Sequence, residues 1–296
     1  MTDTATTGLT DTEAAEFRQK CVDFMDQYGT KPAANLDDQK AFLAASAGAG
    51  LAGLPVAAEY GGGGLTLAHE KIWREVKGNY PMPDGEFIIS HGMCLPMLAE
   101  YGTHEQKERF LADNISGKTM WCQMFSEPGA GSDVASLQTK AELDGDEWVL
   151  NGQKVWTTLA HKSDYGLVVA RTDPDQVKHA GISMFILDMR GQGVEIRPIH
   201  QIDGGSHFNE VFMTDARIPK DWLEPRHGDV DVRACRHRWR RRRQDQPAEL
   251  QDAAQGRRVD RPDQQSGGAR SDDEDLVDGD LQVAGGDEDP RRDEGR

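Results

Sequence analysis

The spacing of the apolar residues changes near Met120, and this change constrains the fold more than any other feature of the sequence. Before it, apolar residues recur at helical spacing, as in "DTEAAEFRQKCVDFMDQYG" at 11–29. After it, short segments rich in β-branched and aromatic residues alternate with turn signals. The 296 residues leave room for two domains. We therefore expect an α+β multidomain chain, with an all-α N-terminal domain over 1–119 and a small antiparallel β-barrel as the middle domain over 120–223.

Helix signals divide the first domain into five segments. Thr103 is a suitable N-cap residue, and Gln106 stands at the capping-box position three residues on. Pro55 and the four glycines at 61–64 predict a loop between two helices. The expected helices cover residues 11–28, 37–50, 66–78, 85–102 and 103–117.

Short strands separated by turns are expected in the middle domain. The turn signals are Asp144-Gly145, Asn151-Gly152, Asp173-Pro174 and the segment 191–193. The expected strands lie within 120–125, 137–143, 147–152, 153–158, 165–173, 181–189, 194–199 and 207–215.

Beyond Leu223 the composition changes. Residues 224–296 contain no Lys, Asn, Ile, Phe, Tyr, Met or Thr, whereas Arg occurs fifteen times. So few large apolar residues cannot offset the entropy cost of ordering, and we expect a largely disordered low-complexity tail. Most of the missing residue types have A/T-rich codons, which suggests a high-GC gene read out of frame. A genuine acidic tail is the alternative interpretation.

The formal net charge of −17 argues against general affinity for nucleic acid or anionic membranes, and for a cytoplasmic protein. The start of the chain has neither the basic nor the apolar region of a signal peptide. No apolar run approaches the ~20 residues of a membrane span. The run "RHRWRRRR" at 236–243 is typical of a nucleic-acid patch, but acids flank it, and a solvated charge run is the preferred interpretation.

Metal sites and disulfides are not expected. The nearest candidate ligands, His227, Cys235 and His237, lack a second ligand pair at metal spacing. The cysteines lie far apart without a C-x-x-C pair and are predicted to be reduced thiols: Cys21, Cys94, Cys122 and Cys235.

The stretch "QMFSEPGAGSD" at 123–133 is a candidate anion site. It lacks the third glycine of G-x-G-x-x-G, and no Lys-Ser or Lys-Thr pair follows as in a P-loop. Two glycines, a serine hydroxyl and nearby backbone amides can still form a nest for a phosphate. An ordinary glycine-rich turn is the competing interpretation.

The stretch "NGQKVWTTLAHKSD" at 151–164 is a second candidate. Trp156 and Thr158 are alternate residues of an expected strand, so their side chains share one face. A flat aromatic ring beside a hydroxyl suits an isoalloxazine ring, although a core tryptophan is the alternative. His161 and His207 lie in turns near this face and are interpreted as surface or hydrogen-bonded histidines.

Taken together, these stretches resemble the acyl-CoA dehydrogenase flavoprotein family. The resemblance rests on "FSEPGAGSD", "NGQKVWTT", "ARTDPD", "GISMFILDM" and "ARIPKDWL", and upstream on "AGLPVAAEYGGGGL" and "YGTHEQKERFLADNISGKTMWCQMFSEP". It covers roughly residues 11–223. The segment "HFNEVFM" is most similar to bacterial members that act on bulky or branched acyl chains.

The resemblance implies an FAD site. Phe125 and Ser126 would offer backbone amides to the pyrimidine end of the flavin, and Ser126 also its hydroxyl. Gly131 and Ser132 would meet the pyrophosphate, with Ser132 also beside the acyl-CoA substrate. Trp156 would stack near the ring system. The expected cofactor-binding residues are Gln123, Met124, Phe125, Ser126, Gly131, Ser132, Trp156, Thr157 and Thr158, with Thr158 bonded to N5.

The resemblance also implies an enzyme. The family carries out α,β-dehydrogenation of an acyl-CoA thioester to the 2-enoyl-CoA, as in β-oxidation and fatty acid metabolism. A glutamate in the family's C-terminal helical domain removes the α-proton, and electrons pass to an electron-transfer flavoprotein. Here residues 224–296 take the place of that domain. Glu249 is the nearest glutamate by position, but its surroundings do not match, so the base is unknown and little activity is expected from this chain.

Two other functions stay open. One is a flavin-dependent oxidase or monooxygenase on the same fold. The other is an inactive or partner-dependent subunit, because family members form homo- or hetero-oligomers.

Overall fold

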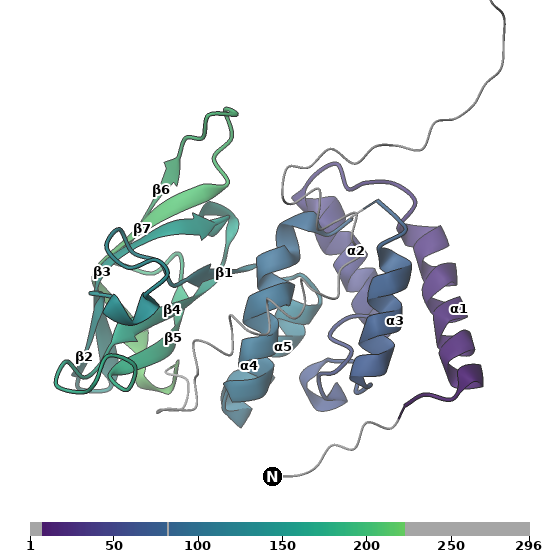
Figure 1. The fold of residues 1–296 in the computed structure, drawn as a ribbon, viewed down its shortest axis with the longest axis horizontal. Coiled ribbons are helices and arrows are strands. Elements are labelled where there is room, and N and C mark those ends of the chain that lie inside the picture. The colour runs from purple at the N-terminus through teal and green to yellow at the C-terminus, as the bar shows by residue number, and fades with distance from the viewer. Residues whose placement is uncertain (1–7, 82, 223–296) are drawn as a thin grey trace, which may run out of the picture. The chain divides into compact units, whose positions relative to one another are not determined.

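The structure is a computed structural model that describes residues 8–81 and 83–222. All of the described residues belong to one compact unit. The helices come first along the chain, in purple to blue, and the strands follow in teal to green (Figure 1). The expectations for residues 224–296 lie outside the described residues, and so do the candidates His227, Cys235, His237 and Glu249.

Five α-helices occupy the N-terminal half of the described chain. They are α1 Asp11–Tyr28, α2 Leu36–Gly48, α3 Leu67–Lys77, α4 Leu95–Tyr101 and α5 His104–Ile115. Short helical segments join them: η1 Ala58–Tyr60, η2 Gly85–Phe87 and η3 Ser90–Cys94. The expected helices at 11–28, 37–50, 66–78 and 103–117 are thereby confirmed to within a few residues.

Capping boxes begin α1 and α5. The predicted box of α5 is confirmed, because Thr103 Oγ1 accepts the N–H of Gln106 and Gln106 Oε1 accepts the N–H of Thr103. Thr10 and Glu13 form the same reciprocal pair at α1. Each box satisfies N–H groups that have no partner within the helix.

The expected helical stretch over 85–102 is confirmed over 85–101, but it is not a uniform α-helix. The segment starts with the 3₁₀ turn η2, passes through Ile88 and Ile89 into the π-helix η3, and continues from Leu95 as α4. Pro96, in the first turn of α4, has no N–H to donate to the preceding turn, so regular α-helical bonding cannot run through this point. π-Helical turns of this kind frequently mark functional sites.

The glycine run at 61–64 forms the predicted loop. Gly61 has φ +83°, in the region that favours glycine. A Cβ at Gly62 would overlap the backbone carbonyl of Val56. The loop therefore folds back on the segment around Pro55.

Seven strands form one mixed, curled sheet. They are β1 Trp121–Met124, β2 Lys140–Asp144, β3 Glu147–Thr158, β4 Tyr165–Arg171, β5 Ile182–Asp188, β6 Val194–Ile199 and β7 Phe208–Pro219. The order is β1-β4-β2-β3-β7-β6, with β5 pairing β4. Three short 3₁₀ turns complete this half: η4 Val134–Ser136, η5 Ala160–Lys162 and η6 Lys220–Trp222. The middle domain expected as a small antiparallel barrel is thus a half-barrel that is mostly antiparallel.

The two parallel pairings involve β4. Strand β1 pairs the first part of β4, from Trp121↔Tyr165 to Met124↔Val168. Strand β2 pairs its last residue, through Lys140↔Arg171. The consecutive strands β1 and β2 therefore run along β4 in the same direction, and residues 125–139 between them leave the sheet as an excursion loop.

The predicted turn at Asn151-Gly152 is wrong. Strand β3 is continuous from Glu147 to Thr158, and its register with β7 shifts between Leu150 and Gly152. The extra residue of this β-bulge lies on β7, where Thr214 and Asp215 oppose Asn151 and Asp215 has φ +50°. Gly152 packs against Thr139, where a Cβ would not fit. Asp144-Gly145, by contrast, forms the β2–β3 hairpin turn as predicted.

Helices and strands share a hydrophobic core. Four aromatic rings pack edge-on or tilted where they meet: Phe110 of α5, Trp121 of β1, Tyr165 of β4 and Trp222. Ser90 of the π-helix adds a polar link, because its Oγ accepts Asn114 Nδ2 at 2.9 Å and the N–H of Trp121 at 3.2 Å. These contacts fix η3 against the first strand.

The described cysteines are buried free thiols: Cys21, Cys94 and Cys122. None of the described helices combines the length and the apolar character that a bilayer-spanning helix requires. Within the described residues, no three His, Cys, Asp or Glu side chains gather in a way that would hold a metal ion.

Candidate functional site

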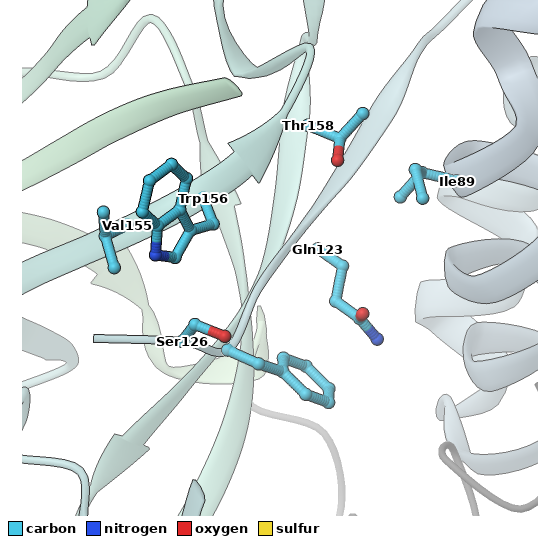
Figure 2. A pocket seen from close by; sticks show the side chains of 7 residues that line it. Ile89, Gln123, Ser126, Val155, Trp156 and Thr158 are labelled. Carbon is cyan, nitrogen blue, oxygen red and sulfur yellow. The ribbon is translucent and has the colours of Figure 1, made fainter. Parts of the chain in front are cut away.

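A shallow pocket of about 90 Å³ lies where the end of β1, the bulged end of β3 and the start of the π-helix meet. Figure 2 shows Ile89 facing Gln123 and Thr158, with Ser126, Val155 and Trp156 around the opening. The lining residues are Ile89, Gln123, Phe125, Ser126, Val155, Trp156 and Thr158. A site that encloses a cofactor-sized ligand usually measures roughly 300–1,000 Å³. These residues thus form one wall of a site.

A backbone hydrogen bond joins two sides of the pocket. After Met124 the chain leaves the sheet, and the carbonyl oxygen of Ser126 accepts the N–H of Val155 at 2.9 Å. The bond holds the first residues of the excursion loop beside β3, so the Ser126 hydroxyl and the β3 side chains open into one space.

Trp156 stands in a strained backbone conformation at the pocket. Its φ is +59°, and the β3–β7 register shifts between Lys154 and Thr157. For a bulky residue a positive φ costs about 1–2 kcal/mol. The side chain is nevertheless 59% exposed, with an edge-to-face contact to Phe208 at 6.0 Å between centroids. The bulge thus turns a large aromatic side chain outward.

A buried ion pair lies behind the pocket wall. Lys154 Nζ contacts Glu127 Oε1 at 2.8 Å and the carbonyl oxygen of Phe125 at 3.2 Å. The Glu127 carboxylate also accepts the backbone N–H groups of Gln138 at 2.6 Å and Thr139 at 3.0 Å. The contacts of Lys154 connect the excursion loop to β3, and those of Glu127 with Gln138 and Thr139 connect two parts of the loop with each other.

Burial governs the electrostatics of this pair. Loss of solvent lowers the pKa of Lys154 to about 8, although the charge of Glu127 opposes the shift. Burial alone would raise the pKa of Glu127. The ammonium of Lys154 and the hydrogen bonds to the carboxylate outweigh it and hold that pKa below its ordinary value.

The structure brings together five of the nine residues that the sequence nominated: Gln123, Phe125, Ser126, Trp156 and Thr158. Trp156 and Thr158 open on the same pocket, as the alternation predicted, and the bulge adds Val155, which precedes Trp156. Met124 is fully buried in the core. Thr157 is also buried, with its carbonyl bonded to Asn209 Nδ2 and its hydroxyl without a partner among the described residues.

Gly131 and Ser132 lie outside the pocket lining, in the exposed part of the excursion loop. A Cβ at Gly129 or Gly131 would meet nothing within 4 Å. The chain's own packing therefore does not require glycine there, and the surface beside this backbone is open to a ligand. Arg171 of β4 stabilises the loop, because its Nη2 donates a hydrogen bond to the carbonyl oxygen of Ala135 at 2.6 Å.

The two histidines behave as interpreted from the sequence. His161 Nδ1 lies 3.0 Å from Asn209 Oδ1, which makes it a hydrogen-bonded histidine. His207 is exposed, and its backbone N–H donates to Gln201 Oε1.

Sequence reasoning missed Glu127, Lys154, Val155 and Ile89. The signal for one of them was present, because Lys154 falls on the same alternation as Trp148 and Leu150, at a core-facing position of β3. A buried lysine needs a carboxylate partner. Which carboxylate it meets depends on tertiary structure.

The lining offers recognition groups and no acid–base group. It carries an indole, a phenyl ring, two hydroxyls and an amide, but no carboxylate or histidine among the described residues. Such a surface can stack on a flat ring and hydrogen-bond its polar edge. It cannot by itself remove a proton from a substrate.

Two domain descriptions of one protein family match the chain. "Acyl-CoA dehydrogenase, N-terminal domain" matches residues 11–118, and "Acyl-CoA dehydrogenase, middle domain" matches residues 122–216. Among curated relatives, the acyl-CoA dehydrogenase IpdE1 of Mycobacterium tuberculosis is 44% identical over 193 residues, which are 65% of this chain and 50% of that protein. The chain spans about half the length of the curated relatives it matches.

Solved structures show the same fold. A variant of the Tcur3481-Tcur3483 steroid ACAD is 27% identical with a TM-score of 0.61, over 73% of this chain and 59% of that chain. The ChsE4-ChsE5 complex from Mycobacterium tuberculosis is 28% identical with a TM-score of 0.61, over 75% of this chain and 57% of that chain.

Proposed function

Because this chain belongs to the acyl-CoA dehydrogenase family, whose members are FAD-dependent flavoproteins, we propose that its pocket receives the isoalloxazine ring of FAD. The expected division into an N-terminal domain over 1–119 and a middle domain over 120–223 is part of the same proposal. The ring would lie against the wall formed by residues 123–126 and 155–158.

The exposure and the strained backbone of Trp156 are the observations on which this proposal mainly rests. Its indole is mostly exposed and its backbone is strained, so neither burial nor local conformation accounts for a tryptophan at this position. Residues held in such conformations cluster at sites of function. A bound aromatic ring would cover the indole and supply the missing contact area.

The neighbouring polar groups suit a flavin as well. Thr158 and Ser126 present hydroxyls, and Gln123 an amide, at the same opening. Such groups hydrogen-bond the heteroatoms at the edge of the ring, and we assign Thr158 to N5 and Ser126 to the pyrimidine end. Gly131, with open space beside its backbone, and the neighbouring Ser132 are proposed to bind the pyrophosphate, and Ser132 the acyl-CoA as well.

The proposed reaction of the whole protein is α,β-dehydrogenation of an acyl-CoA thioester to the 2-enoyl-CoA. FAD, when bound, supplies the two-electron acceptor. The residues of this wall orient the ring and keep water from its face. A base for the α-proton is not among the lining residues, and electrons would leave through an electron-transfer flavoprotein.

A bulky acyl group is the proposed substrate class. Two observations support it: the similarity of "HFNEVFM" to members acting on bulky chains, and the 27% identity to a protein described as a steroid ACAD. A dehydrogenase for short linear chains would instead prefer butyryl-CoA.

A second candidate is a subunit that acts with another chain. The pocket of about 90 Å³ is too shallow to enclose a flavin, so other residues must supply the opposite wall. The similar ChsE4-ChsE5 structure is described as a complex. In this case the wall described here and a wall from the partner would complete one site.

The test is anaerobic reduction of the full-length chain loaded with FAD. A steroid side-chain acyl-CoA and butyryl-CoA are added separately, with an artificial electron acceptor for turnover and mass spectrometry for the enoyl product. Bleaching of the visible flavin band by the bulky substrate supports the dehydrogenase. Bound flavin without bleaching supports the partner-dependent subunit, and failure to bind flavin overturns both.

The Thr158 assignment has its own control. Thr158→Val removes the hydroxyl at nearly constant volume, and it should shift the visible spectrum and the reduction potential of bound flavin. Thr172→Val removes a hydroxyl that bonds Ser183 Oγ on the β4–β5 side, and it should shift neither. Equal spectra for wild type and Thr158→Val contradict the assignment.

A further inference from the structure

The ion pair between Lys154 and Glu127 lies directly behind the pocket and is not among its lining residues. The exposed fraction of the side chain is 0% for Lys154 and 6% for Glu127. Each residue is next to lining residues: Glu127 follows Ser126, and Lys154 precedes Val155. The pair is therefore placed to act on the pocket wall without touching a ligand.

The contacts of the pair converge on the two segments that form the wall. Lys154 Nζ donates a hydrogen bond to the carbonyl oxygen of Phe125. The backbone N–H of the next residue of β3, Val155, donates to the carbonyl oxygen of Ser126. Two successive carbonyls of the loop are thus bonded to two successive residues of the strand. This arrangement fixes the peptide planes from which the Phe125 and Ser126 side chains extend.

Glu127 secures the other end of the excursion loop. Its Oε2 accepts the N–H of Gln138, and its Oε1 accepts both the N–H of Thr139 and Lys154 Nζ. The carboxylate therefore closes the loop at the point where the chain returns to the sheet. A single buried group holds both ends of the loop against β3.

The strain at Trp156 needs such an anchor. A bulky residue at φ +59° persists only where the surrounding structure determines its conformation. On the N-terminal side Lys154 is fixed by the ion pair. On the C-terminal side Thr157 pairs with Asn209 of β7 and its carbonyl accepts Asn209 Nδ2. Trp156 is held between these two fixed points.

A gain in folding stability does not by itself explain why this buried ion pair is present. A buried ion pair pays a desolvation cost, and replacing it with well-packed neutral side chains is often neutral or stabilising. Holding a defined geometry is the better-supported use of such a pair.

We propose that Lys154 and Glu127 are positioning residues that hold the Trp156 indole at a fixed distance from the Phe125–Ser126 segment, and thereby set the geometry of the ring-binding wall. This inference rests on the proposed flavin site. Neither residue contacts the flavin.

The experiment uses the full chain with Glu127→Gln and Lys154→Met combined, which removes both charges and retains an acceptor for the loop N–H groups. The matched control is Glu147→Gln with Arg217→Met, an exposed ion pair between β3 and β7. FAD affinity is measured by quenching of flavin fluorescence under conditions where all proteins are folded, so that a loss of stability does not itself weaken binding. We expect at least a tenfold loss of affinity for the buried pair and less than a twofold loss for the control.

A second readout reports on the indole without flavin. The chain is labelled with 5-fluorotryptophan, and the ¹⁹F resonance of Trp156 is assigned by its absence in Trp156→Phe. In the buried-pair variant this resonance should shift or broaden, while that of Trp121, in the core, stays in place. If the double variant does not fold, Glu127→Gln alone is measured in the same two ways.

The outcomes distinguish a failure of the positioning role from a failure of the proposed flavin site. Wild-type affinity for FAD together with an unmoved Trp156 resonance in the buried-pair variant overturns the positioning role. If wild type binds no FAD, the proposed function fails. The positioning role is then decided by the Trp156 resonance: a shift supports it and an unmoved line overturns it.

Discussion

The N–H of Val155 and the carbonyl oxygen of Ser126 form a hydrogen bond of 2.9 Å that joins a loop leaving one strand to the bulge of another. The bond is not part of the regular pairing of the sheet, in which β3 pairs β2 and β7. It creates a contiguous surface from two segments that are almost thirty residues apart in sequence. The candidate site depends on this junction, and the predictions below probe its parts.

Trp156→Gly should leave stability nearly unchanged. Glycine relieves the strain of φ +59°, which is worth about 1–2 kcal/mol. The loss of the single aromatic contact with Phe208 costs about 0.5–1.5 kcal/mol, so the two effects nearly cancel. Urea unfolding measures the result, and we expect a change within about 1 kcal/mol.

The matched control is Trp121→Ala. Trp121 is 1% exposed and packs against Phe110 and Tyr165, so its loss should cost about 3–5 kcal/mol. A loss of that size at Trp156 would mean that its indole is a core group, which contradicts a role in ligand binding.

Ser90→Ala should destabilise the contact between the π-helix and the sheet. The hydroxyl accepts two buried donors, Asn114 Nδ2 and the N–H of Trp121, and its removal leaves both without that partner. Each unsatisfied buried donor costs about 1–3 kcal/mol. Thermal or urea unfolding measures the change.

Ser116→Ala is the comparison for Ser90→Ala. The Ser116 hydroxyl bonds only backbone carbonyls of its own helix, Ala112 and Asp113. A change within about 0.5 kcal/mol is expected. Equal effects at the two serines would show that Ser90 does not hold η3 against β1.

The stability of wild type should rise with pH relative to the Glu127→Gln, Lys154→Met variant between about pH 8 and pH 10.5. Burial lowers the pKa of Lys154 from 10.5 to about 8, so in this interval the unfolded chain holds a proton that the folded chain lacks. The stability difference then grows by up to about 1.4 kcal/mol per pH unit.

Urea unfolding of both proteins at pH 7.5, 9 and 10 measures this difference. The charged group that faces Lys154 is Glu127, and both are neutralised in the variant, so other titrations cancel. A difference that is flat or falls with pH would show that Lys154 keeps its proton in the folded chain.

Local physics made much of the fold predictable. The capping box of α5, the glycine loop and the change of period near Met120 depend on residues within a few positions of one another. Asn151-Gly152 shows the limit, because the same dipeptide forms a hairpin turn or stays within a strand according to what packs beside it. Here Gly152 packs against Thr139, from another part of the chain, and the pair stays within β3 opposite a bulge of β7.

In the candidate site, too, local features could be predicted from the sequence and features set by tertiary packing could not. Trp156, Thr158 and Ser126 could be nominated because their chemistry and alternation are visible in the sequence. Lys154 and Glu127 could not be paired, because they lie 27 positions apart and meet only after the excursion loop has formed. The positive φ of Trp156 is likewise set by the β3–β7 register.

The most direct test of the central claim is a titration of the full-length chain with FAD, followed by circular dichroism in the visible flavin band. A flavin held against an asymmetric wall acquires an induced signal there, and free FAD in solution gives little. We predict a saturable signal with one FAD per chain in wild type, and at least a tenfold weaker affinity in Trp156→Gly. No induced signal in wild type, or equal affinity in the two proteins, would contradict the account.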